Sequence, residues 1–187
     1  MSDSGFLTNQ FLIAMPNLLD PNFFHSVTYI CEHNENGAMG IVINQPVDLS
    51  LGELISQIGM QTSDPELLGK SVYRGGPVET ERGFVLHQPL GEWESTLSIT
   101  QDIGVSTSND IVQAIADGRG PQQCLVALGY AGWGAGQLEQ EIVDNAWLSG
   151  PSDARIIFET KVEQRWEEAA KLLGVDINQM TGDAGHA

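Results

Sequence analysis

Short apolar runs typical of β-strands alternate with short amphipathic runs typical of helices along most of the chain. β-Branched, aromatic and other apolar residues predict strands at 10–16, 25–33, 41–43, 72–76, 83–89, 95–106, 123–133, 146–151 and 154–160. We expect the first three to form a meander, because Asn36-Gly37 is a hairpin-type turn signal between the second and the third.

Four helices are predicted, over residues 50–59, 107–118, 136–145 and 160–174. Ser50 with Glu53 forms a capping-box pattern, and Gly59 ends that helix. Thr107 or Ser108 would cap the second helix. Thr160 with Glu163 is a second capping-box pattern and would start the last helix.

These elements predict an α/β chain of one compact domain, because 187 residues with 41% hydrophobic content suffice for one core. We expect a single globular domain over residues 1–175. The small, polar stretch 176–187 is expected to be a flexible tail.

The net charge of the chain limits the classes of partner that it could bind. The formal net charge is −17, with 25 acidic against 8 basic residues, and no lysine or arginine precedes Lys70. Nucleic-acid affinity depends largely on basic side chains that neutralise phosphates, so direct DNA or RNA binding is disfavoured. An anionic membrane surface is disfavoured for the same reason, whereas a basic partner would be favoured.

Targeting signals and thiols point to the cytoplasm. The first residues have neither a positive start nor an uninterrupted apolar core, so we expect no secretory signal, and no apolar run is long enough to span a bilayer. Cys31 and Cys124 each lie in an apolar run, which favours buried, reduced thiols over a disulfide.

Motifs for metal, phosphate and nucleophilic chemistry are missing from the sequence. The spacing of His25, Cys31 and His33 favours a buried sheet face over a metal site, and we predict neither a metal nor a cofactor. The glycines of 129–136 fit no dinucleotide fingerprint and lack a P-loop lysine, which favours close packing near Trp133 and Trp147. A Cys–His pair remains open, since only the fold can bring cysteine and histidine together.

Two similar short runs within the sequence suggest one candidate site. The runs GIVINQP, from Gly40, and GFVLHQP, from Gly83, share Gly, Val, Gln and Pro at matching positions. The residue pattern common to strands is enough to explain this similarity. The alternative is that the two strands are counterparts that present Asn44 and His87 at equivalent places.

Arg74 is the other candidate, because it stands directly before Gly75-Gly76-Pro77 in VYRGGPV. It could meet an anionic ligand beside the backbone N–H groups of the following turn. In so acidic a chain, an ion pair with Glu79, Glu81 or another carboxylate is the favoured interpretation. The candidate ligand site therefore comprises Arg74, Gly75, Gly76, Asn44 and His87, and no catalytic residue is assigned.

Four stretches together resemble the YqgE/AlgH family of bacterial proteins, also known as UPF0301. They are FLIAMPNLLDPNFFHSVTYICEHNENGAMGIVINQP, YRGGPV, GFVLH and ALGYAGWGAGQLEQEI, in that order along the chain. The resemblance runs from about Phe6 to about Leu173. It implies a bent mixed sheet curled into a partial barrel, with about four helices packed outside, and it implies no catalytic residue or ligand.

Three functions follow as expectations. The first is a non-enzymatic cytoplasmic protein that acts through protein partners, in a regulatory role. The second is a small-molecule-binding protein or an enzyme with a pocket near Arg74, Asn44 and His87. The third, a direct DNA-binding regulator, needs a basic element that reads a groove, and none of the predicted helices supplies one.

Overall fold

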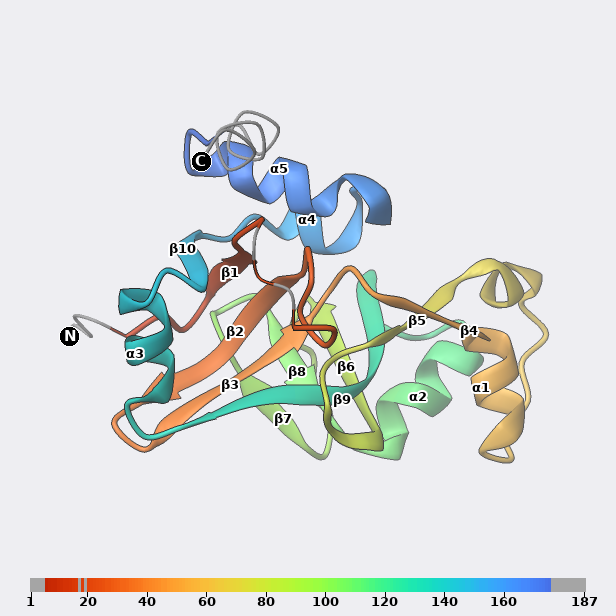
Figure 1. Cartoon of the computed structure of the whole chain (residues 1–187). Coiled ribbons are helices and arrows are strands. Elements are labelled where there is room, and N and C mark those ends of the chain that lie inside the picture. The colour runs from red at the N-terminus through yellow and green to blue at the C-terminus, as the bar shows by residue number, and fades with distance from the viewer. Residues whose placement is uncertain (1–5, 17, 19, 176–187) are drawn as a thin grey trace. The chain divides into compact units, whose positions relative to one another are not determined.

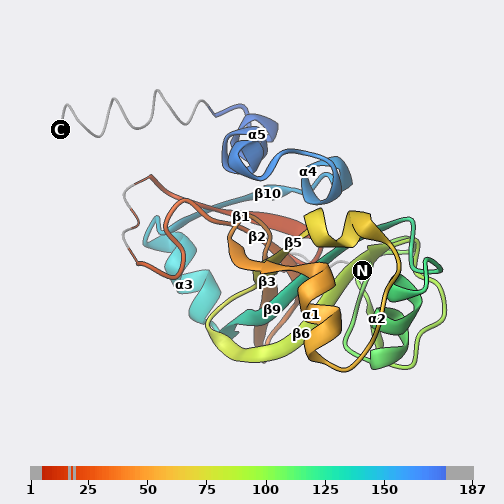
Figure 2. The same cartoon turned by 90° about the vertical axis from the view of Figure 1, so that its right-hand side faces the viewer.

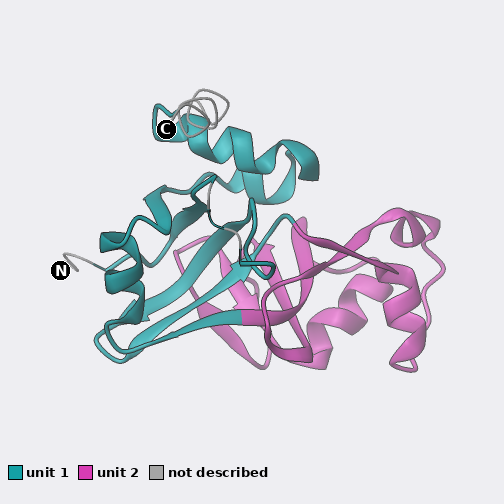
Figure 3. Cartoon of the chain, viewed as in Figure 1, with its two compact units in different colours: residues 1–44, 131–187 teal, residues 45–130 magenta. Residues whose placement is uncertain are grey.

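The computed structural model describes residues 6–16, 18 and 20–175, which form two compact units. Unit 1 comprises 1–44 and 131–187, and unit 2 comprises 45–130 (Figure 3). The chain passes between the units after Asn44 and again after Tyr130, within strand β9 (Gln123–Gly134). The expected tail, 176–187, lies outside the described residues, and the single domain over 1–175 stays a prediction.

Unit 1 contains an antiparallel sheet in the order β10-β1-β2-β3-β9. Its other strands are β1 (Gln10–Ala14), β2 (Val27–Asn34), β3 (Gly37–Val42) and β10 (Trp147–Pro151) (Figure 1). Its helical elements are α3 (Gln137–Val143), α4 (Ala154–Phe158), the 3-10 turn η2 (Val162–Gln164) and α5 (Arg165–Leu172). The predicted meander of the first three strands is confirmed.

Unit 2 contains a mixed set of strand pairs. Its strands are β4 (Pro46–Ser50), β5 (Ser71–Arg74), β6 (Val78–Gln88), β7 (Thr96–Ser98), β8 (Gly104–Ser106) and the first part of β9. Its helical elements are α1 (Leu51–Gln57), the 3-10 turn η1 (Pro65–Gly69) and α2 (Asn109–Ala116). β5 pairs with β9 in parallel, and the other strand pairs of this unit are antiparallel.

The helices of unit 2 cover one face of its strands. α1 and α2 lie side by side (Figure 2) and bury apolar residues against that face. The buried cluster is Leu51, Ile55, Leu67, Val72, Val85, Ile111, Ile115, Ala116 and Val126. Burial of this kind contributes about 25 cal/mol per Å² of apolar surface, so the two short helices depend on it.

Most predicted helix boundaries are correct. The capping box of α1 is present, because the Ser50 hydroxyl accepts the Glu53 N–H and the Glu53 carboxylate accepts the Ser50 N–H. Ser108 is the N-cap residue of α2. Gly59 and Gly118 follow the ends of α1 and α2 with positive φ, as helix-ending glycines do.

The strand predicted at 154–160 is wrong, because this segment contains α4. The Asp153 carboxylate accepts the Arg155 N–H at 2.9 Å and caps the helix. A strand would point Ile156 and Ile157 to opposite faces, whereas both are buried here. The chain therefore has five α-helices in its described residues instead of about four.

The start predicted for the last helix is also wrong. Thr160 does not cap Glu163; its hydroxyl donates to the carbonyl of Arg155 at 3.2 Å and so completes the end of α4. η2 precedes α5, which begins at Arg165. The sequence has the capping-box pattern, but the Thr160 hydroxyl bonds to the end of the preceding helix, α4, instead.

The strand predicted over 123–133 is confirmed as β9, which continues through the first part of the glycine-rich stretch to Gly134. Gly37 makes this possible, since a Cβ at that position would lie 2.3 Å from the carbonyl oxygen of Trp133. Because glycine carries only a hydrogen atom in place of a side chain, the backbones of β3 and β9 can approach closely enough to pair here. β4 was not predicted, because Pro46 and Asp48 interrupt its apolar pattern.

Candidate functional site

Backbone hydrogen bonds hold the Arg74-Gly75-Gly76-Pro77 turn in place. The N–H of Arg74 donates to Gln45 at 2.7 Å, and the N–H of Gly75 donates to Leu128 at 2.8 Å. A Cβ on Gly75 would lie 2.3 Å from the Gly129 carbonyl oxygen, and one on Gly129 would lie 2.6 Å from that of Gly76. The glycines therefore permit close backbone contact, which gives the motif a packing role.

Asn44 fastens the start of β2 in unit 1. Its Oδ1 accepts the N–H of Val27 at 2.9 Å, and its Nδ2 donates to the carbonyl of His25 at 2.9 Å. His25 has a φ of 54°, an uncommon conformation for a residue with a side chain. Its ring stacks between Phe24 and Trp166, with centroids 3.8 Å apart on each side. Both ends of the Asn44 amide therefore stabilise a strained turn.

His87 lies buried in β6 of unit 2, with both ring nitrogens in hydrogen-bond contact. Nδ1 lies 3.0 Å from the carbonyl oxygen of Pro89, and Nε2 lies 2.7 Å from the Ser106 hydroxyl. The Ser106 oxygen also lies 2.7 Å from the Thr96 hydroxyl. Desolvation by burial lowers the pKa of His87, while the Pro89 contact opposes this in part.

The proposed equivalence of Asn44 and His87 is not what the structure has. Asn44 follows the end of β3 and holds backbone groups, whereas His87 lies inside β6 opposite Cys124. The two residues belong to different units. None of the five predicted site residues lines any of the three pockets described below. The ligand site at these residues stays a prediction.

The fold brings one cysteine close to one histidine, but the two side chains do not form the Cys–His pair that the sequence left open. His87 and Cys124 are cross-strand partners, yet both nitrogens of His87 contact other groups. Burial raises the pKa of the Cys124 thiol and of the Cys31 thiol, which opposes the thiolate that a nucleophile needs. Both cysteines are free.

His33 is buried in unit 1 and takes part in a structural contact. Its Nδ1 accepts the N–H of Leu7 at 2.9 Å, and its Nε2 lies 3.2 Å from a carboxylate oxygen of Glu139. Within residues 6–16, 18 and 20–175, no group of three or more His, Cys, Asp or Glu side chains has the arrangement of a metal site.

The glycine-rich motif positions tryptophans. Glu141 on α3 accepts the indole N–H of Trp133 at 3.0 Å and that of Trp147 at 2.9 Å through the same oxygen. Gln137 donates to the other carboxylate oxygen of Glu141 and accepts the N–H of Gly134. The motif thus fastens α3 to the sheet of unit 1.

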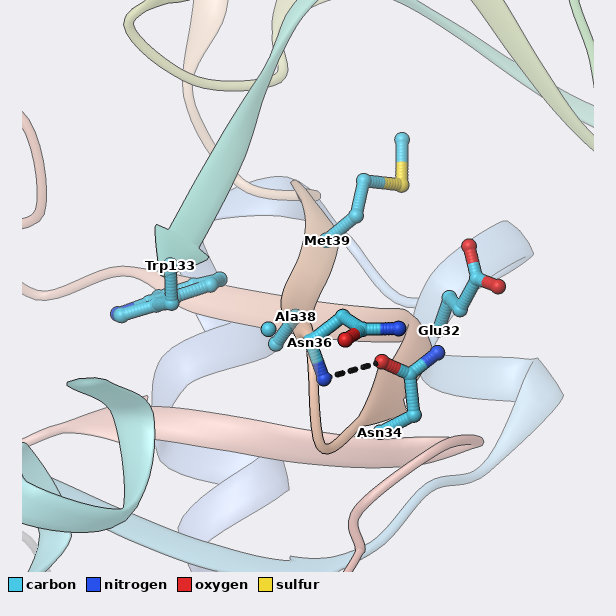
Figure 4. Close-up of a pocket in the computed structure, with 7 residues that line it drawn as sticks. Glu32, Asn34, Asn36, Ala38, Met39 and Trp133 are labelled. Carbon is cyan, nitrogen blue, oxygen red and sulfur yellow. Dashed lines mark hydrogen bonds between the residues drawn. The ribbon is translucent and has the colours of Figure 1, made fainter. Parts of the chain in front are cut away.

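Three pockets among the described residues are candidates for a binding site. One lies at the β2–β3 hairpin of unit 1, has a volume of about 240 Å³ and is lined by polar side chains such as Glu32, Asn34 and Asn36 (Figure 4). Asn34 uses its Oδ1 to accept the Asn36 N–H at 2.8 Å, which stabilises the hairpin turn. A second, with a volume of about 540 Å³, follows the β6 bulge at Pro77 and residues 79–82, where Glu79 pairs with Arg82.

The third pocket, which we call the α1–α2 pocket, has the composition of a binding site. It lies wholly in unit 2 and has a volume of about 190 Å³. Its apolar lining is Leu54, Ile58, Val85, Val112, Val126 and Leu128, and its other lining residues are Glu81, Gly83, Ser106, Thr107, Ser108 and Asn109. Apolar walls with a few convergent polar groups are typical of binding pockets.

Sequence reasoning missed this pocket. Both helices that line it were predicted, but no pocket was predicted between them. Ile58, which continues the apolar face of α1, is 47% exposed. Ser106 carries no local signal, since its contact with His87 depends on the pairing of β6 with β8.

Comparisons with known proteins agree with one another. The model of the AlgH-like family matches residues 11–178. UPF0301 proteins of Thioalkalivibrio sulfidiphilus and Nitrosococcus oceani are 59% and 51% identical over 187 residues, each covering 100% of both chains. The solution structure of AlgH from Pseudomonas aeruginosa is 48% identical, with a TM-score of 0.80 over 100% of this chain and 99% of that one.

A more distant structure supports the fold alone. The crystal structure of protein DIP2367 from Corynebacterium diphtheriae has a TM-score of 0.71 at 19% identity, covering 92% of this chain and 90% of that one. The predicted mixed α/β fold and the predicted family resemblance are both confirmed. No helix among the described residues is long and apolar enough to cross a membrane. The chain belongs to the AlgH-like, or UPF0301, family.

Proposed function

We propose that this protein acts by binding another protein, one of whose large apolar side chains enters the α1–α2 pocket. The observation that carries the proposal is the exposed Ile58 beside a pocket with apolar walls. Isolated surface apolar residues are common, but an exposed one that continues into an apolar hollow is typical of an interface anchor.

The size of the pocket favours a side chain over a whole metabolite. Its volume of about 190 Å³ is below the roughly 300–1,000 Å³ of typical small-molecule sites. A single large side chain needs less room, and protein interfaces often depend on one such anchor in a pocket.

The charge of the chain supports a basic partner. The net charge is −17, and Glu81 lies in the lining of the pocket itself. Complementary charge raises the association rate and loses its effect with added salt. The same charge opposes direct DNA binding, so a regulatory role would be exerted through the partner. Free thiols at Cys31 and Cys124 support placing this function in the cytoplasm.

The test compares partners of two matched variants expressed in the native host. Ile58→Asp places a charge at the mouth of the pocket, and Val143→Asp places one on α3 of unit 1, where Val143 is 73% exposed. We expect a protein that purifies with the wild type and with Val143→Asp but not with Ile58→Asp. Binding of that purified protein should weaken as salt is raised.

Two results would contradict the proposal. One is a set of bound proteins that Ile58→Asp leaves unchanged while circular dichroism shows it folded. The other is the loss of a bound metabolite, and of no protein, in that variant. Replacing Arg74 with Ala tests the separate prediction of a ligand site at the Gly75-Gly76 turn, since it leaves the α1–α2 pocket intact.

A further inference from the structure

The last part of β9 forms an open edge of the sheet of unit 1. Residues 131–134 pair with β3 on one side. On the other side, β9 pairs with β6 only as far as Tyr130 and with β5 only as far as Leu128. No strand of the described residues pairs with 131–134 there, and Figure 3 shows this part of β9 along the border of unit 1. We propose that an extended segment of a partner protein pairs with this edge and places an arginine opposite Gly132.

The backbone groups of Gly132 point out of this edge. The N–H of Gly134 donates to the side-chain oxygen of Gln137 at 3.0 Å, so it points away from β3. Backbone groups alternate in direction along an antiparallel strand, so those of Gly132 point the same way as those of Gly134. Gln137 already occupies the N–H of Gly134, whereas no hydrogen bond within the described part of the chain occupies the outward N–H and C=O of Gly132.

This edge lacks the features that commonly keep strand edges from pairing. Natural edges are often blocked by a charged side chain, a proline or a bulge. Residues 131–134 are Ala, Gly, Trp and Gly, and both Gly132 and Gly134 are exposed. Because these glycines have no side chain, a second backbone can come close to the strand. Proteins with such an edge can bind an extended segment by adding it to their sheet.

A carboxylate on the same face of the sheet selects the side chain of the partner. Glu32 lies opposite Met39, and Met39 lies opposite Gly132, so the three form one row across the sheet. Glu32 and Met39 line the pocket at the β2–β3 hairpin, and Figure 4 shows their side chains on the same side of the two strands. Glu32 is exposed and forms no ion pair with another described residue. A partner residue opposite Gly132 extends this row.

The length of the row favours arginine as that residue. Cross-strand neighbours lie about 4.5–5.5 Å apart between Cα atoms, so a residue opposite Gly132 lies about 15 Å from Glu32. Extended arginine and glutamate side chains reach about 7 Å and about 5 Å from their Cα atoms, which leaves about one hydrogen-bond distance. Lysine is shorter by about 1 Å. A guanidinium group can also bind both oxygens of a carboxylate.

The net charge favours a basic partner over a second copy of this chain. Each copy carries a formal charge of −17, so two copies repel each other, whereas an arginine-bearing segment is attracted. This contact lies in unit 1 and uses no residue of the α1–α2 pocket, so it goes beyond the proposed function. Ile58→Asp should therefore leave it unchanged.

The test is a titration of the isotope-labelled chain with a synthetic peptide, followed by NMR spectroscopy. The probe is the acetylated and amidated peptide Thr-Val-Thr-Arg-Thr-Val-Thr, whose β-branched residues favour an extended conformation. We expect the amide signal of Gly132 to shift and its hydrogen exchange to slow at least about 5-fold at saturation. The same peptide with a methyl group on the arginine amide nitrogen should bind about 10-fold more weakly, because it cannot donate to the Gly132 carbonyl.

Two matched variants test the role of the arginine. Glu32→Gln removes the charge from the row, and Glu35→Gln removes one from the turn of the same hairpin, outside the pocket lining. We expect the dissociation constant of the peptide to rise about 5–10-fold in Glu32→Gln and less than about 2-fold in Glu35→Gln. A peptide with glutamate in place of arginine should leave the Gly132 signal of the wild type unchanged.

Four results would overturn the proposal. A Gly132 signal that the arginine peptide does not move would show that the edge is not its binding site. Equal affinity of the methylated peptide would exclude backbone pairing at Gly132, and equal affinity of Glu32→Gln and Glu35→Gln would exclude a specific contact with Glu32. A Gly132 signal that moves with protein concentration alone would show that a second copy occupies the edge. The first and last results need no variant, so a folding defect cannot obscure them.

Discussion

Gly75 and Gly129 show at the scale of single residues how a motif can be structural. Each would place a Cβ within 2.6 Å of a carbonyl oxygen of the other segment. Contacts below about 3 Å between a Cβ and a backbone oxygen do not occur without movement of one of them. Any residue larger than glycine would therefore separate β5 from β9.

We predict that Gly75→Ala lowers the free energy of unfolding by about 1–3 kcal/mol, because the added methyl group forces the backbones apart. Gly83→Ala is the matched control, since no atom lies within 4 Å of a Cβ there and its cost should stay below about 0.5 kcal/mol. Urea unfolding followed by far-UV circular dichroism measures both. Equal losses in the two variants would show that the close contact does not matter.

His87 gives a prediction for pH. Its pKa is lowered by burial in the folded chain, so between that pKa and about 6.5 the unfolded chain binds more protons than the folded one. Stability should therefore be full above about pH 6.5 and fall as the pH is lowered towards the pKa of the folded state. Urea midpoints from pH 7.5 to 5.5 should fall less in His87→Gln than in the wild type; parallel curves would contradict this assignment.

At the scale of elements, α3 depends on one carboxylate. Glu141 accepts two indole N–H groups from two strands of unit 1, so both donors lose their partner if it is removed. Loss of a partner by a buried donor costs more than the bond itself contributes.

Glu141→Leu should therefore destabilise the chain by about 1–3 kcal/mol. Glu141→Gln retains an oxygen that can accept both indoles, and it should lose less than half as much. Thermal unfolding followed by tryptophan emission measures both losses, and Trp133 and Trp147 are two of the four tryptophans that contribute to the signal. Equal losses in the two variants would mean that the charge, which both remove, and not hydrogen bonding, holds α3.

Local sequence patterns predicted an element correctly where the interactions that form it lie within one segment of the chain. Ser50 and Glu53 bond within one helical turn, so their pattern was sufficient. Thr160 had the same pattern, but a preceding helix uses its hydroxyl, which only the fold reveals. The α1–α2 pocket could not be predicted for the same reason, since it needs two helices and the register of three strands.

For the whole molecule, charge is the property with the widest effect. A net charge of −17 opposes compaction through self-repulsion, and the basic residues are too few to neutralise it. Ion pairs such as Arg119 with Asp117 are exposed and contribute little.

We predict that raising sodium chloride from about 10 mM to about 500 mM increases the melting temperature by at least about 2 °C, because screening relieves the repulsion between carboxylates. Choline chloride at equal ionic strength should give the same increase, since screening does not depend on the cation. Differential scanning fluorimetry measures both. A melting temperature that falls or stays constant would contradict the repulsion argument.

The division of the chain also sets an order for folding during synthesis. Unit 2 is one continuous segment, 45–130, and all of it has been made once Tyr130 leaves the ribosome. Unit 1 has its first strands at the start of the chain, but the end of β9, β10 and the last two helices are made only later. During translation, β1 to β3 therefore emerge first and must wait, with apolar faces uncovered, until the ribosome delivers their remaining neighbours.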